Sequence, residues 1–559
     1  MDILKISKRY KDFKRLKQIL STFLKYGFDD VVERIEAKRS LRVSKIVLKT
    51  MKRKELEGFT TPQRVRMAFE ELGPTFIKFG QMLSVRPGLI PRDFTEELSK
   101  LQDAVAPFSY ELSQSIIERD LSKPVDHLFS SFEKNPIAAA SLAQVHQATT
   151  LNGEEVVVKI KRPDISSLIE SDIRILLDLA KLIERYIPES ELYNPTGLVH
   201  EFAKTIREEL DFLREGRNID RFRRHFAEDD TVYILKVFWE LTTSNVLTME
   251  RIRGIKPSDI ESIEKAGLDR KIIAENGAHL ILEEVFEHRF FHADPHPGNI
   301  FILENNVIAP VDFGMVGYID ESIADQIGKL LIGIIRRDSD RVVGVLATLG
   351  MIDETFDQYG LRYDISNFIE HYHQVSFYKI NMSHIIEELI DISWKYGIRL
   401  PLPIVMMSRA LMLSEALGRL LYPEFNMIPF IVPYEKKILQ KRFRRRGKEA
   451  VRFLEGMNLF IQRLPYDLSE ILTKIKQGKL IVNLEHKGLE RLTDERNRAI
   501  NHISFSFIIA ALIIGSSFII RYQMKPIIFG YSLVGLLGFF FAGVLGIWVI
   551  ISALRSGRL

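Results

Sequence analysis

The chain has 559 residues, of which 46% are hydrophobic, and its formal net charge is +4 at pH 7. This length predicts two or three structural units with a sizeable core, and the mild net charge gives no indication of nucleic-acid binding. The sequence contains no cysteine, which excludes disulfide bonds, zinc–cysteine sites and thiol catalysis and fits a protein that faces the cytosol.

Residues 1–57 are predicted to form a basic helical segment. Between residues 1 and 26, lysine and arginine far outnumber the acidic residues. This amphipathic pattern allows two interpretations, a helix packed on its own protein or a helix lying on a membrane surface. The segment lacks the uninterrupted apolar core of a secretory signal peptide. Apolar residues recur at helical spacing, at Phe13, Leu16, Leu20, Phe23 and Leu24.

The next two regions change from helical to β-rich character. Residues 58–130 are predicted to form a helical extension that prolines interrupt. Residues 131–254 are predicted to form a β-rich N-lobe, in which two strands flank a turn at Asn152-Gly153, because Asn-Gly is a strong hairpin signal. Within the N-lobe, residues 165–225 return to helical periodicity, and residues 232–252 contain two further β-rich runs.

A predominantly helical C-lobe is predicted for residues 255–433. Its exception is a short β-hairpin, in which the runs IFIL and VIAPV flank a turn at residues 304–306. Residues 434–500 are predicted to form a charged helical connector, which includes the basic run KKILQKRFRRRGK at residues 436–448.

Residues 501–559 are predicted to form a two-helix transmembrane anchor. Ile503–Ile520 and Ile527–Ile551 contain no charged residue, and each is long enough to cross roughly 30 Å of hydrocarbon. Basic residues beyond both outer ends predict that the two termini lie in the cytoplasm. The alternative is a buried helix pair in a soluble domain. Small residues at every fourth position would let the helices approach closely; these are Ala511 and Gly515, and Gly538, Ala542 and Gly546.

The most informative segment is HRFFHADPHPGNIFILENNVIAPVDFG, at residues 288–314. Asp294 is followed by Asn299, and the predicted hairpin then leads to Asp312-Phe313-Gly314. In phosphoryl transfer, one carboxylate orients the attacking hydroxyl or water, an amide oxygen holds a metal ion, and a second carboxylate bridges Mg²⁺ to the nucleotide phosphates. The pattern therefore predicts a bilobal, kinase-like layout, with Asp294 catalytic and Asn299 and Asp312 as Mg²⁺ ligands.

The same segment also raises the alternative of a metal site formed by His292, Asp294 and His296. Alternating residues of an extended segment point in different directions, so they would need a bend to bind one ion. The preferred interpretation makes His292 structural and His296 a local hydrogen-bonding residue.

Lys159 ends an apolar, β-branched run, VVVKIKRP. A lysine held on a strand can contact the α- and β-phosphates of a nucleotide when a carboxylate orients it. The spacing leaves open which downstream acid does so, although residues four apart share one face of a helix. The candidates are predicted to lie on one helix and are Glu208, Glu209, Asp211 and Glu215.

No G-x-G-x-x-G loop precedes Lys159, and PIAAASLAQVH occupies its place at residues 136–146. Ala138, Ala139 and Ala140 permit close backbone approach, but they disfavour the positive φ that glycine allows. A nucleotide loop of this composition would be stiffer than a glycine-rich one. The alternative is an ordinary helix of small residues.

Taken together, these motifs resemble the UbiB/AarF/ADCK family of atypical protein-kinase-like proteins over residues 60–430. Lys78-Phe79-Gly80-Gln81 is similar to the family's KxGQ motif, AAASLAQVH to its alanine-rich loop, and Glu209-Leu210-Asp211 to its ExD motif. HADPHPGN and DFG are similar to its catalytic and metal motifs. The two C-terminal apolar stretches are also similar to those of bacterial members.

The resemblance implies an α+β fold, namely a bilobal protein-kinase-like fold with an N-terminal helical extension and a C-terminal transmembrane helical hairpin. It implies that the chain binds ATP or ADP with Mg²⁺ and acts as an ATPase, because the KxGQ segment would cover the place where protein kinases admit a peptide. It also implies Glu215 as the partner of Lys159. The predicted catalytic residues are Asp294, Lys159 and Asn299, and the predicted regulatory residues are Lys78, Gln81, Glu209 and Asp211. The predicted nucleotide contacts are Ala138, Ala139, Ala140, Ser141, Lys159, Glu215, Met249, Glu250 and Arg251.

The resulting hypothesis is a Mg²⁺-dependent ATPase that supports isoprenoid quinone biosynthesis, anchored in the bacterial inner membrane with its catalytic domain in the cytoplasm. Expected partners are membrane lipids and isoprenoid quinone precursors or quinone-biosynthesis proteins; nucleic acid is not expected, and a homodimer stays open. The alternatives are a small-molecule or lipid phosphotransferase and a nucleotide-gated membrane scaffold. A conventional protein kinase is disfavoured, because residues 312–345 contain no evident activation loop ending in Ala-Pro-Glu.

Overall fold

The structure is a computed structural model, and it divides the chain into two compact units, Met1–Gly447 and Lys448–Leu559. Most of the predicted connector at 434–500, and of the segment 30–57, lies outside the residues that the structure describes. Those are residues 3–29, 56, 58–84, 90–101, 105–186, 194–350, 357–374, 381–431, 433–434, 476, 489–522, 525–528 and 531–555.

The first unit begins with helices on which the rest of the unit packs. Thr60 caps α4, because its side chain accepts a hydrogen bond from the backbone of Gln63 while the Gln63 side chain accepts one from the backbone of Thr60. Gly73, at φ +90°, ends α4, and Pro74 begins α5, where a missing N–H costs nothing. The helices of this region are α1 (Ile3–Lys25), α4 (Thr61–Leu72), α5 (Pro74–Ser84), α6 (Arg92–Leu98) and α7 (Tyr110–Leu121).

The N-lobe contains a five-stranded antiparallel sheet in the order β1-β3-β4-β5, with β2 paired to β3. The predicted hairpin at Asn152-Gly153 is present, and Gly153 has a φ of +83°. Alternate residues of β4 point to opposite faces, so Val156, Val158 and Ile160 pack under α7 while Lys159 faces the other way. The strands are β1 (Phe129–Phe132), β2 (Ala138–Ala139), β3 (Ala143–Thr150), β4 (Glu155–Lys161) and β5 (Val246–Glu250).

Three helices lie between β4 and β5 in the chain: α8 (Ile165–Tyr186), α9 (Pro195–Glu209) and α10 (Phe212–His225). The prediction of one helix carrying all four acidic candidates was wrong. Asp211 has a φ of −94° and a ψ of 91°, and its side chain accepts a hydrogen bond from the backbone of Arg214 as the N-cap of α10. The capping tendency of aspartate prevailed over the continuing periodicity.

Two other predictions for the N-lobe also need correction. Of the two β-rich runs at 232–252, only β5 is a strand; Val232 and Val237 make isolated bridges, and Trp239–Leu241 is a 3₁₀ turn. The alternative of a small-residue helix at 136–146 was wrong, because Ala138 and Ala139 form β2.

The C-lobe is mainly helical, as predicted, and the hairpin before Asp312 is present as β7 (Ile300–Ile302) and β8 (Ile308–Pro310). A further two-stranded sheet, β6 (Phe290–His292) with β9 (Val316–Tyr318), was not predicted. Short 3₁₀ turns lie at Val125–His127, Pro297–Asn299 and Glu304–Asn306, and a π-helical turn at Glu284–His288. The helices are α11 (Ile260–Lys265), α12 (Arg270–Glu283), α13 (Glu321–Ile335), α14 (Ser339–Leu349), α15 (Gln358–Gln374), α16 (Met382–Lys395) and α17 (Leu402–Leu421).

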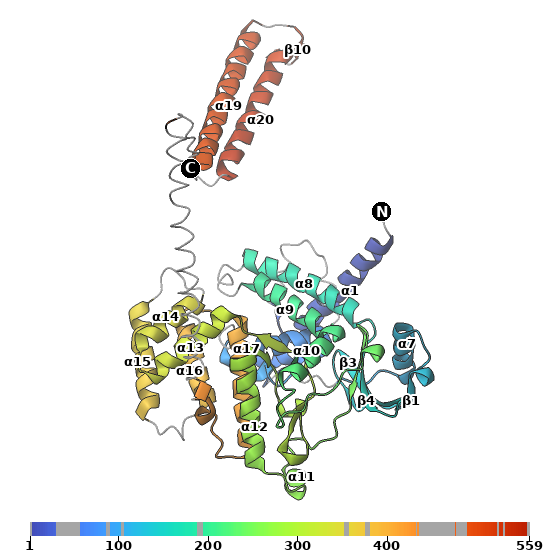
Figure 1. Cartoon of the computed structure of the whole chain (residues 1–559). Helices are drawn as coiled ribbons and strands as arrows, with labels where there is room; N and C mark the ends of the chain where they lie inside the picture. The colour runs from blue at the N-terminus through green and yellow to red at the C-terminus, as the bar shows by residue number, and fades with distance from the viewer. Residues whose placement is uncertain are drawn as a thin grey trace. The chain divides into compact units, whose positions relative to one another are not determined.

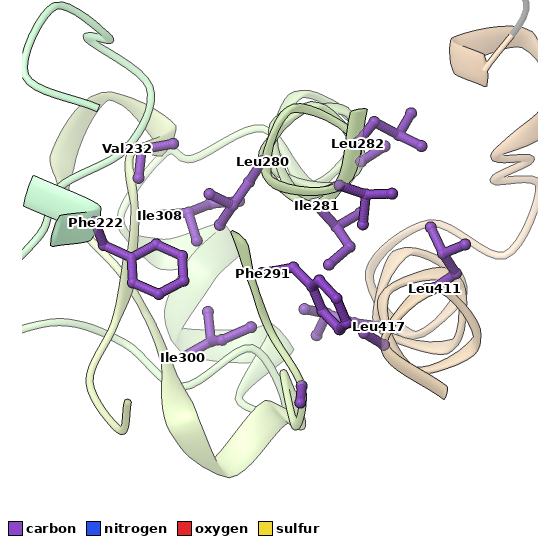
Figure 2. Packing of buried hydrophobic residues seen from close by; sticks show 14 of the residues in the cluster. Phe222, Val232, Leu280, Ile281, Leu282, Phe291, Ile300, Ile308, Leu411 and Leu417 are labelled. Carbon is purple, nitrogen blue, oxygen red and sulfur yellow. The ribbon is translucent and has the colours of Figure 1, made fainter. Parts of the chain in front are cut away.

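The C-lobe core forms where α12 and α17 run side by side in the first unit (Figure 1). Figure 2 shows Phe291 of β6 pointing toward Leu417 of α17, with Ile281 of α12 nearby. Ile300 and Phe222 belong to the same buried cluster. This packing holds the short β-hairpin and sheet that carry Asp294 and Asp312 against two long helices.

Among its described residues, the second unit includes the helices α19 (Leu489–Arg521) and α20 (Leu533–Arg555), which contact each other (Figure 1). The second apolar helix begins later than predicted, because residues 527–532 include a small hairpin of β10 (Ile527–Ile528) and β11 (Tyr531–Ser532). By length and composition, Ser504–Arg521 could cross a membrane, and 6% of it is buried, whereas Leu533–Ile547 is a shorter apolar helix.

Small residues bring α19 and α20 together, but not all of the predicted ones do so. A Cβ added at Gly538 would overlap the side chain of Ser516, and Ala542 is 3% exposed. By contrast, a Cβ at Gly515 or Gly546 would meet nothing within 4 Å. The close approach therefore runs along only part of the predicted stripe.

Candidate active site

A buried ion pair joins the two halves of the candidate site. The Lys159 ammonium on β4 donates to both carboxylate oxygens of Glu215 on α10, at 2.8 and 2.9 Å. The Glu215 side chain is 2% exposed and that of Lys159 17%. Of the acids left open by spacing, Glu215 is thus the one that binds Lys159, because the α10 N-terminus at Asp211 turns Glu215 toward the sheet.

The charge of Lys159 is maintained by its neighbours. Burial lowers the pKa of Lys159, but the negative charges of Asp312 and Glu215 outweigh this effect and raise it above its usual value. Lys159 Nζ lies 3.9 Å from Asp312 Oδ2, farther than from Glu215. The ammonium therefore stays charged and lies between two carboxylates.

Asp312-Phe313-Gly314 is held rigidly next to this pair. Phe313 is fully buried, its ring lies 4.9 Å from that of Phe222, and its carbonyl accepts a hydrogen bond from the Asn218 side chain at 3.0 Å. Asp312 Oδ1 accepts a hydrogen bond from the backbone of Gly314 at 3.0 Å. Partial burial raises the pKa of Asp312, but the positive charge of Lys159 has the opposite effect, and the resulting pKa is about 2. This carboxylate is therefore ionised at neutral pH.

Asp294 has a partner that the sequence did not reveal. Arg409 of α17 donates to Asp294 Oδ1 at 2.9 Å, and both side chains are partly exposed. The two residues are 115 positions apart in the chain. No motif around Arg409 marks it, because α17 is predicted by its apolar periodicity alone.

Asn299 lies at the start of β7, directly across the hairpin from the residue before Asp312. The Ile300–Pro310 pair ends the β7–β8 ladder, and the backbone of Val311 donates to the Asn299 carbonyl at 3.0 Å. The hairpin thus brings Asn299 and Asp312, which are distant in sequence, to the same end of the ladder.

Three of the four predicted regulatory residues, Lys78, Glu209 and Asp211, lie near Glu215 or on its helix, whereas Gln81 bonds elsewhere. Lys78 Nζ on α5 lies 2.5 Å from Glu209 Oε1 at the end of α9. Gln81 donates to the carbonyl of Leu101 at 3.0 Å, and Asp211 caps α10. Gly314 approaches both Glu209 and Glu215, since a Cβ there would lie about 4 Å from each. The Lys78–Glu209 pair therefore adjoins the Lys159–Glu215 pair.

The alanine-rich loop is held by Arg162. Its guanidinium donates to the carbonyls of Ala140 and Ala106, each at 3.1 Å, while the Arg162 backbone donates to Leu142. Ala138 and Ala139 pair with β3, and the adjacent Ser141 is fully buried. This loop is thus held by backbone hydrogen bonds and by the Arg162 guanidinium, and its greater stiffness stays a prediction.

Three predicted nucleotide contacts have other partners in the structure. Met249 is a core residue, 6% exposed. The Glu250 carboxylate accepts from the Tyr233 hydroxyl at 2.8 Å and from the Lys236 backbone at 3.1 Å. Arg251 donates from its backbone to Glu155. The side chains of Met249 and Glu250 are thus used for packing and local bonding, and a nucleotide contact by these residues stays a prediction.

The histidines around Asp294 take local roles. Burial lowers the pKa of His292, and its Nδ1 accepts a hydrogen bond from the backbone of Asp294 at 3.2 Å. His296 Nδ1 accepts from the backbone of Gly298. Across the parts of the chain that the structure describes, no group of three or more His, Asp or Glu residues could hold a metal ion. The three-ligand alternative therefore finds no support there.

The Asp312 carboxylate and the Asn299 amide fit a Mg²⁺ ion that is also bound by the phosphate oxygens of a nucleotide. Mg²⁺ is typically bound through one or two carboxylates plus substrate phosphates. The Asp312 carboxylate is ionised and 43% exposed, and Asn299 lies at the same end of the hairpin. One carboxylate and one amide oxygen suit such a shared ion, and Lys159 supplies a charge for the same phosphates.

Comparisons with known proteins agree on the class. The ABC1 atypical kinase-like domain matches residues 100–346, the UbiB helical domain residues 365–426, and the ABC1/UbiB kinase-like C-terminal domain residues 487–555. The protein is thus an atypical kinase-like protein.

Individual relatives identify the family, within this class, to which the chain belongs. An uncharacterized protein in the hydrogenase 1 5′ region of Clostridium pasteurianum is 31% identical over 551 residues, 98% of this chain and 99% of its own length. A probable protein kinase UbiB of Aeromonas hydrophila is 36% identical over 431 residues, 76% of this chain and 78% of its own. The chain belongs to the UbiB family. Among solved structures, the Rv3197–erythromycin complex of Mycobacterium tuberculosis is 21% identical, with a TM-score of 0.40 over 62% of this chain and 94% of that one.

Proposed function

We propose that this UbiB-family protein binds ATP with Mg²⁺ and hydrolyses it in support of the biosynthesis of an isoprenoid quinone of the ubiquinone or menaquinone type. The observation that carries the proposal is the convergence of the buried Lys159–Glu215 pair with the partly exposed Asp312 carboxylate, with Asp294 two residues after strand β6. A dead scaffold would have no need to keep a buried lysine charged, because burying unneeded charge is costly.

Each residue has a distinct task in this proposal. Lys159, oriented by Glu215, contacts the nucleotide phosphates, and Asn299 and Asp312 hold Mg²⁺, which supplies charge neutralisation for those phosphates. Asp294 orients the attacking water through the carboxylate oxygen that does not accept from Arg409. The hydrogen bond from Arg409 fixes the rotamer of Asp294, so this carboxylate is positioned before the nucleotide arrives.

Lys78 and the alanine-rich loop restrain this site, and contact with a membrane or lipid releases it. Lys78 binds Glu209 next to the Lys159–Glu215 pair, so movement of α5 would change the charge around the phosphates. The Arg162 clamp likewise resists movement of the loop. The proposal also assigns the second unit a role as a membrane anchor in the bacterial inner membrane. Support for it comes from the exposed apolar side chains of α19 and α20, such as Phe507 and Phe540.

The experiment is ATP hydrolysis by the purified full chain, with and without anionic liposomes that carry prenylphenol-like lipids. Wild type should be stimulated by the liposomes. Asp312→Asn should lose at least about 100-fold in kcat, the scale of removing a group that stabilises charge in the transition state. Lys78→Ala should raise the liposome-free rate, because the restraint is weakened.

The outcomes separate the alternatives. A wild-type rate that liposomes do not change would rule out release by the membrane, although not hydrolysis itself. Appearance of a phosphorylated lipid would favour a lipid phosphotransferase. Full complementation of quinone synthesis by Asp294→Asn would instead support a nucleotide-gated scaffold.

A further inference from the structure

The helical part of the C-lobe encloses a second site, distinct from the candidate active site. A cavity of about 180 Å³ lies among α13, α14, α15, α16, α17 and residues 428–431. Ile327, Leu331, Ile386, Leu389, Ile404 and Leu411 are among its lining side chains. For comparison, an apolar cavity of about 150 Å³ in another protein stays dry and binds benzene.

The wall of this cavity offers almost nothing polar to a ligand. Among its described lining residues, none is charged, and the polar side chains are Tyr372, Ser393 and Ser408. The Tyr372 hydroxyl donates to Glu388 at 2.8 Å, and the Ser393 hydroxyl donates to the Leu389 carbonyl at 2.7 Å. These two hydroxyls are therefore already paired. An occupant would meet hydrocarbon at nearly every point where it touches the wall.

The apolar lining of the cavity determines which class of ligand can bind there. A polar molecule would lose its hydrogen bonds to water without replacement, and a charged head group would have no counter-ion in the wall. Scaling from the six carbons of benzene, the cavity has room for roughly six to eight carbon atoms. These constraints fit a segment of flexible hydrocarbon whose polar end stays outside.

We propose that this cavity binds the hydrocarbon tail of a membrane lipid. By length and composition, the helix at Ser504–Arg521 could cross a membrane. A chain anchored in this way would be exposed to the hydrocarbon tails of membrane lipids. The site is separate from the nucleotide residues, and the inference does not rest on ATP hydrolysis. One helix serves both sites, since Met407 and Leu411 of α17 line the cavity and Arg409 of α17 binds Asp294.

The test is photo-crosslinking of the full chain in phospholipid nanodiscs. Two probes carry a diazirine near the end of the tail, one on a saturated ten-carbon chain and one on a geranyl chain. Mass spectrometry should map crosslinks to peptides of α13, α16 and α17, in addition to any on 504–551. Competition by unlabelled geranylgeraniol or palmitate then shows whether an isoprenoid or an acyl tail binds more tightly.

Leu389→Trp is the diagnostic variant, because the larger ring fills part of the cavity. It should lower C-lobe labelling by about tenfold or more. Leu420→Trp is the matched control on α17, where Leu420 is 44% exposed, and its labelling should equal that of wild type. Retained thermal stabilisation by ADP and Mg²⁺ shows that each variant is folded.

Two results would overturn the proposal. One is labelling confined to residues 504–551 in the wild type, which would place the probes only in the bilayer. The other is C-lobe labelling that folded Leu389→Trp leaves unchanged, since the probe would then lie outside this cavity.

Discussion

Arg409 lies outside every recognised motif, yet it binds Asp294, the residue proposed to be catalytic. Its guanidinium accounts for one oxygen of Asp294 and leaves the other for a nucleophile. Charge-assisted hydrogen bonds of this kind are short and directional. Arg409 touches neither substrate nor metal in this scheme and is a positioning residue.

We expect Arg409→Met to lower kcat for ATP hydrolysis by about tenfold, which is about 1.4 kcal/mol of barrier. The KM for ATP should change little, because Lys159 and Asp312 are untouched. Steady-state kinetics separates the two parameters. Arg362→Met is the control and should leave kcat unchanged, because Arg362 pairs with the exposed Asp340 at the surface; Arg409→Lys should recover part of the loss. An unaltered kcat in Arg409→Met would contradict the positioning role.

Glu284 is a second residue with a property set by the fold, namely the pKa of its buried carboxyl group. It is 1% exposed, and its carboxylate oxygen accepts a hydrogen bond from the backbone of His292 at 2.9 Å. Burial raises the pKa of Glu284 from 4.5 to about 8, against the smaller opposing effect of that hydrogen bond. The folded chain therefore keeps a proton that the unfolded chain loses between these two pH values.

The wild-type protein should lose stability as pH rises from about 4.5 to about 8, because over this window the unfolded state binds fewer protons at Glu284. At about 1.4 kcal/mol per pH unit, the total effect is several kcal/mol. Glu284→Gln removes the titration, so its stability relative to wild type should increase from pH 5 to pH 8. Urea unfolding at both pH values measures this difference. Substitution of the exposed Glu240 by Gln is the control; parallel curves for wild type and Glu284→Gln would refute the assignment.

At the scale of elements, α1 is an integral part of the first unit. Arg15 donates to both carboxylate oxygens of Asp172 on α8, at 2.7 and 2.9 Å, and also to the carbonyl of Leu72 at the end of α4. Asp172 is fully buried. Arg15 therefore does more than form a solvated face, and the interpretation of a helix packed on its own protein describes the part of α1 around Arg15.

Arg15→Ala should destabilise the first unit by about 3 kcal/mol, because it leaves the Asp172 carboxylate buried without its cation. The change is measured as a shift in urea midpoint, with faster proteolysis within α1 as a second readout. Lys25→Ala is the control, since Lys25 pairs with Glu71 at the surface and such pairs contribute little. Equal stability of Arg15→Ala and Lys25→Ala would show that the pair does not hold α1.

Short sequence patterns predicted the β-hairpins correctly, because each hairpin depends on a turn of a few neighbouring residues. Asn152-Gly153 marked the β3–β4 hairpin, and the asparagines at 305 and 306, both at positive φ, lie in the β7–β8 turn. Periodicity failed at Asp211, where a side-chain cap ends one helix and begins another. The β6–β9 pair was missed because three-residue strands carry too little periodicity to be recognised, and their pairing depends on residues 24 or more positions apart.

At the scale of the whole molecule, the chain divides at Gly447 into a unit that carries every candidate site residue and a unit whose described residues lie mainly in α19 and α20. In the proposed function, the first unit binds and hydrolyses ATP, and the second unit anchors the protein in the membrane. Among the described residues of the second unit, many large apolar side chains on α19 and α20 are exposed, which is the composition that a bilayer stabilises.

A chain ending at Gly447 should lose the stable membrane attachment of the full chain. We expect the full chain to stay with the membrane pellet in high salt and carbonate, and the shortened chain to appear mainly in the supernatant, because only a hydrophobic anchor resists these washes. Fractionation and immunodetection measure the distribution. Full-length protein with Asp312→Asn is the control and should pellet. Carbonate-resistant pelleting of the shortened chain, with nucleotide binding intact, would contradict the anchor.

The sequence by itself determined the order of the motifs, the hairpins around short polar turns and the apolar stretches near the C-terminus, because these depend on neighbouring residues. The family motifs also implied Glu215 as the partner of Lys159, which the structure confirms across 56 positions, although spacing alone had left the acid open. Only the tertiary structure decided that Arg409 reaches Asp294 and that five helices leave an apolar cavity. Such pairs and cavities arise when distant segments pack into one core, and no local pattern records which side chains then meet.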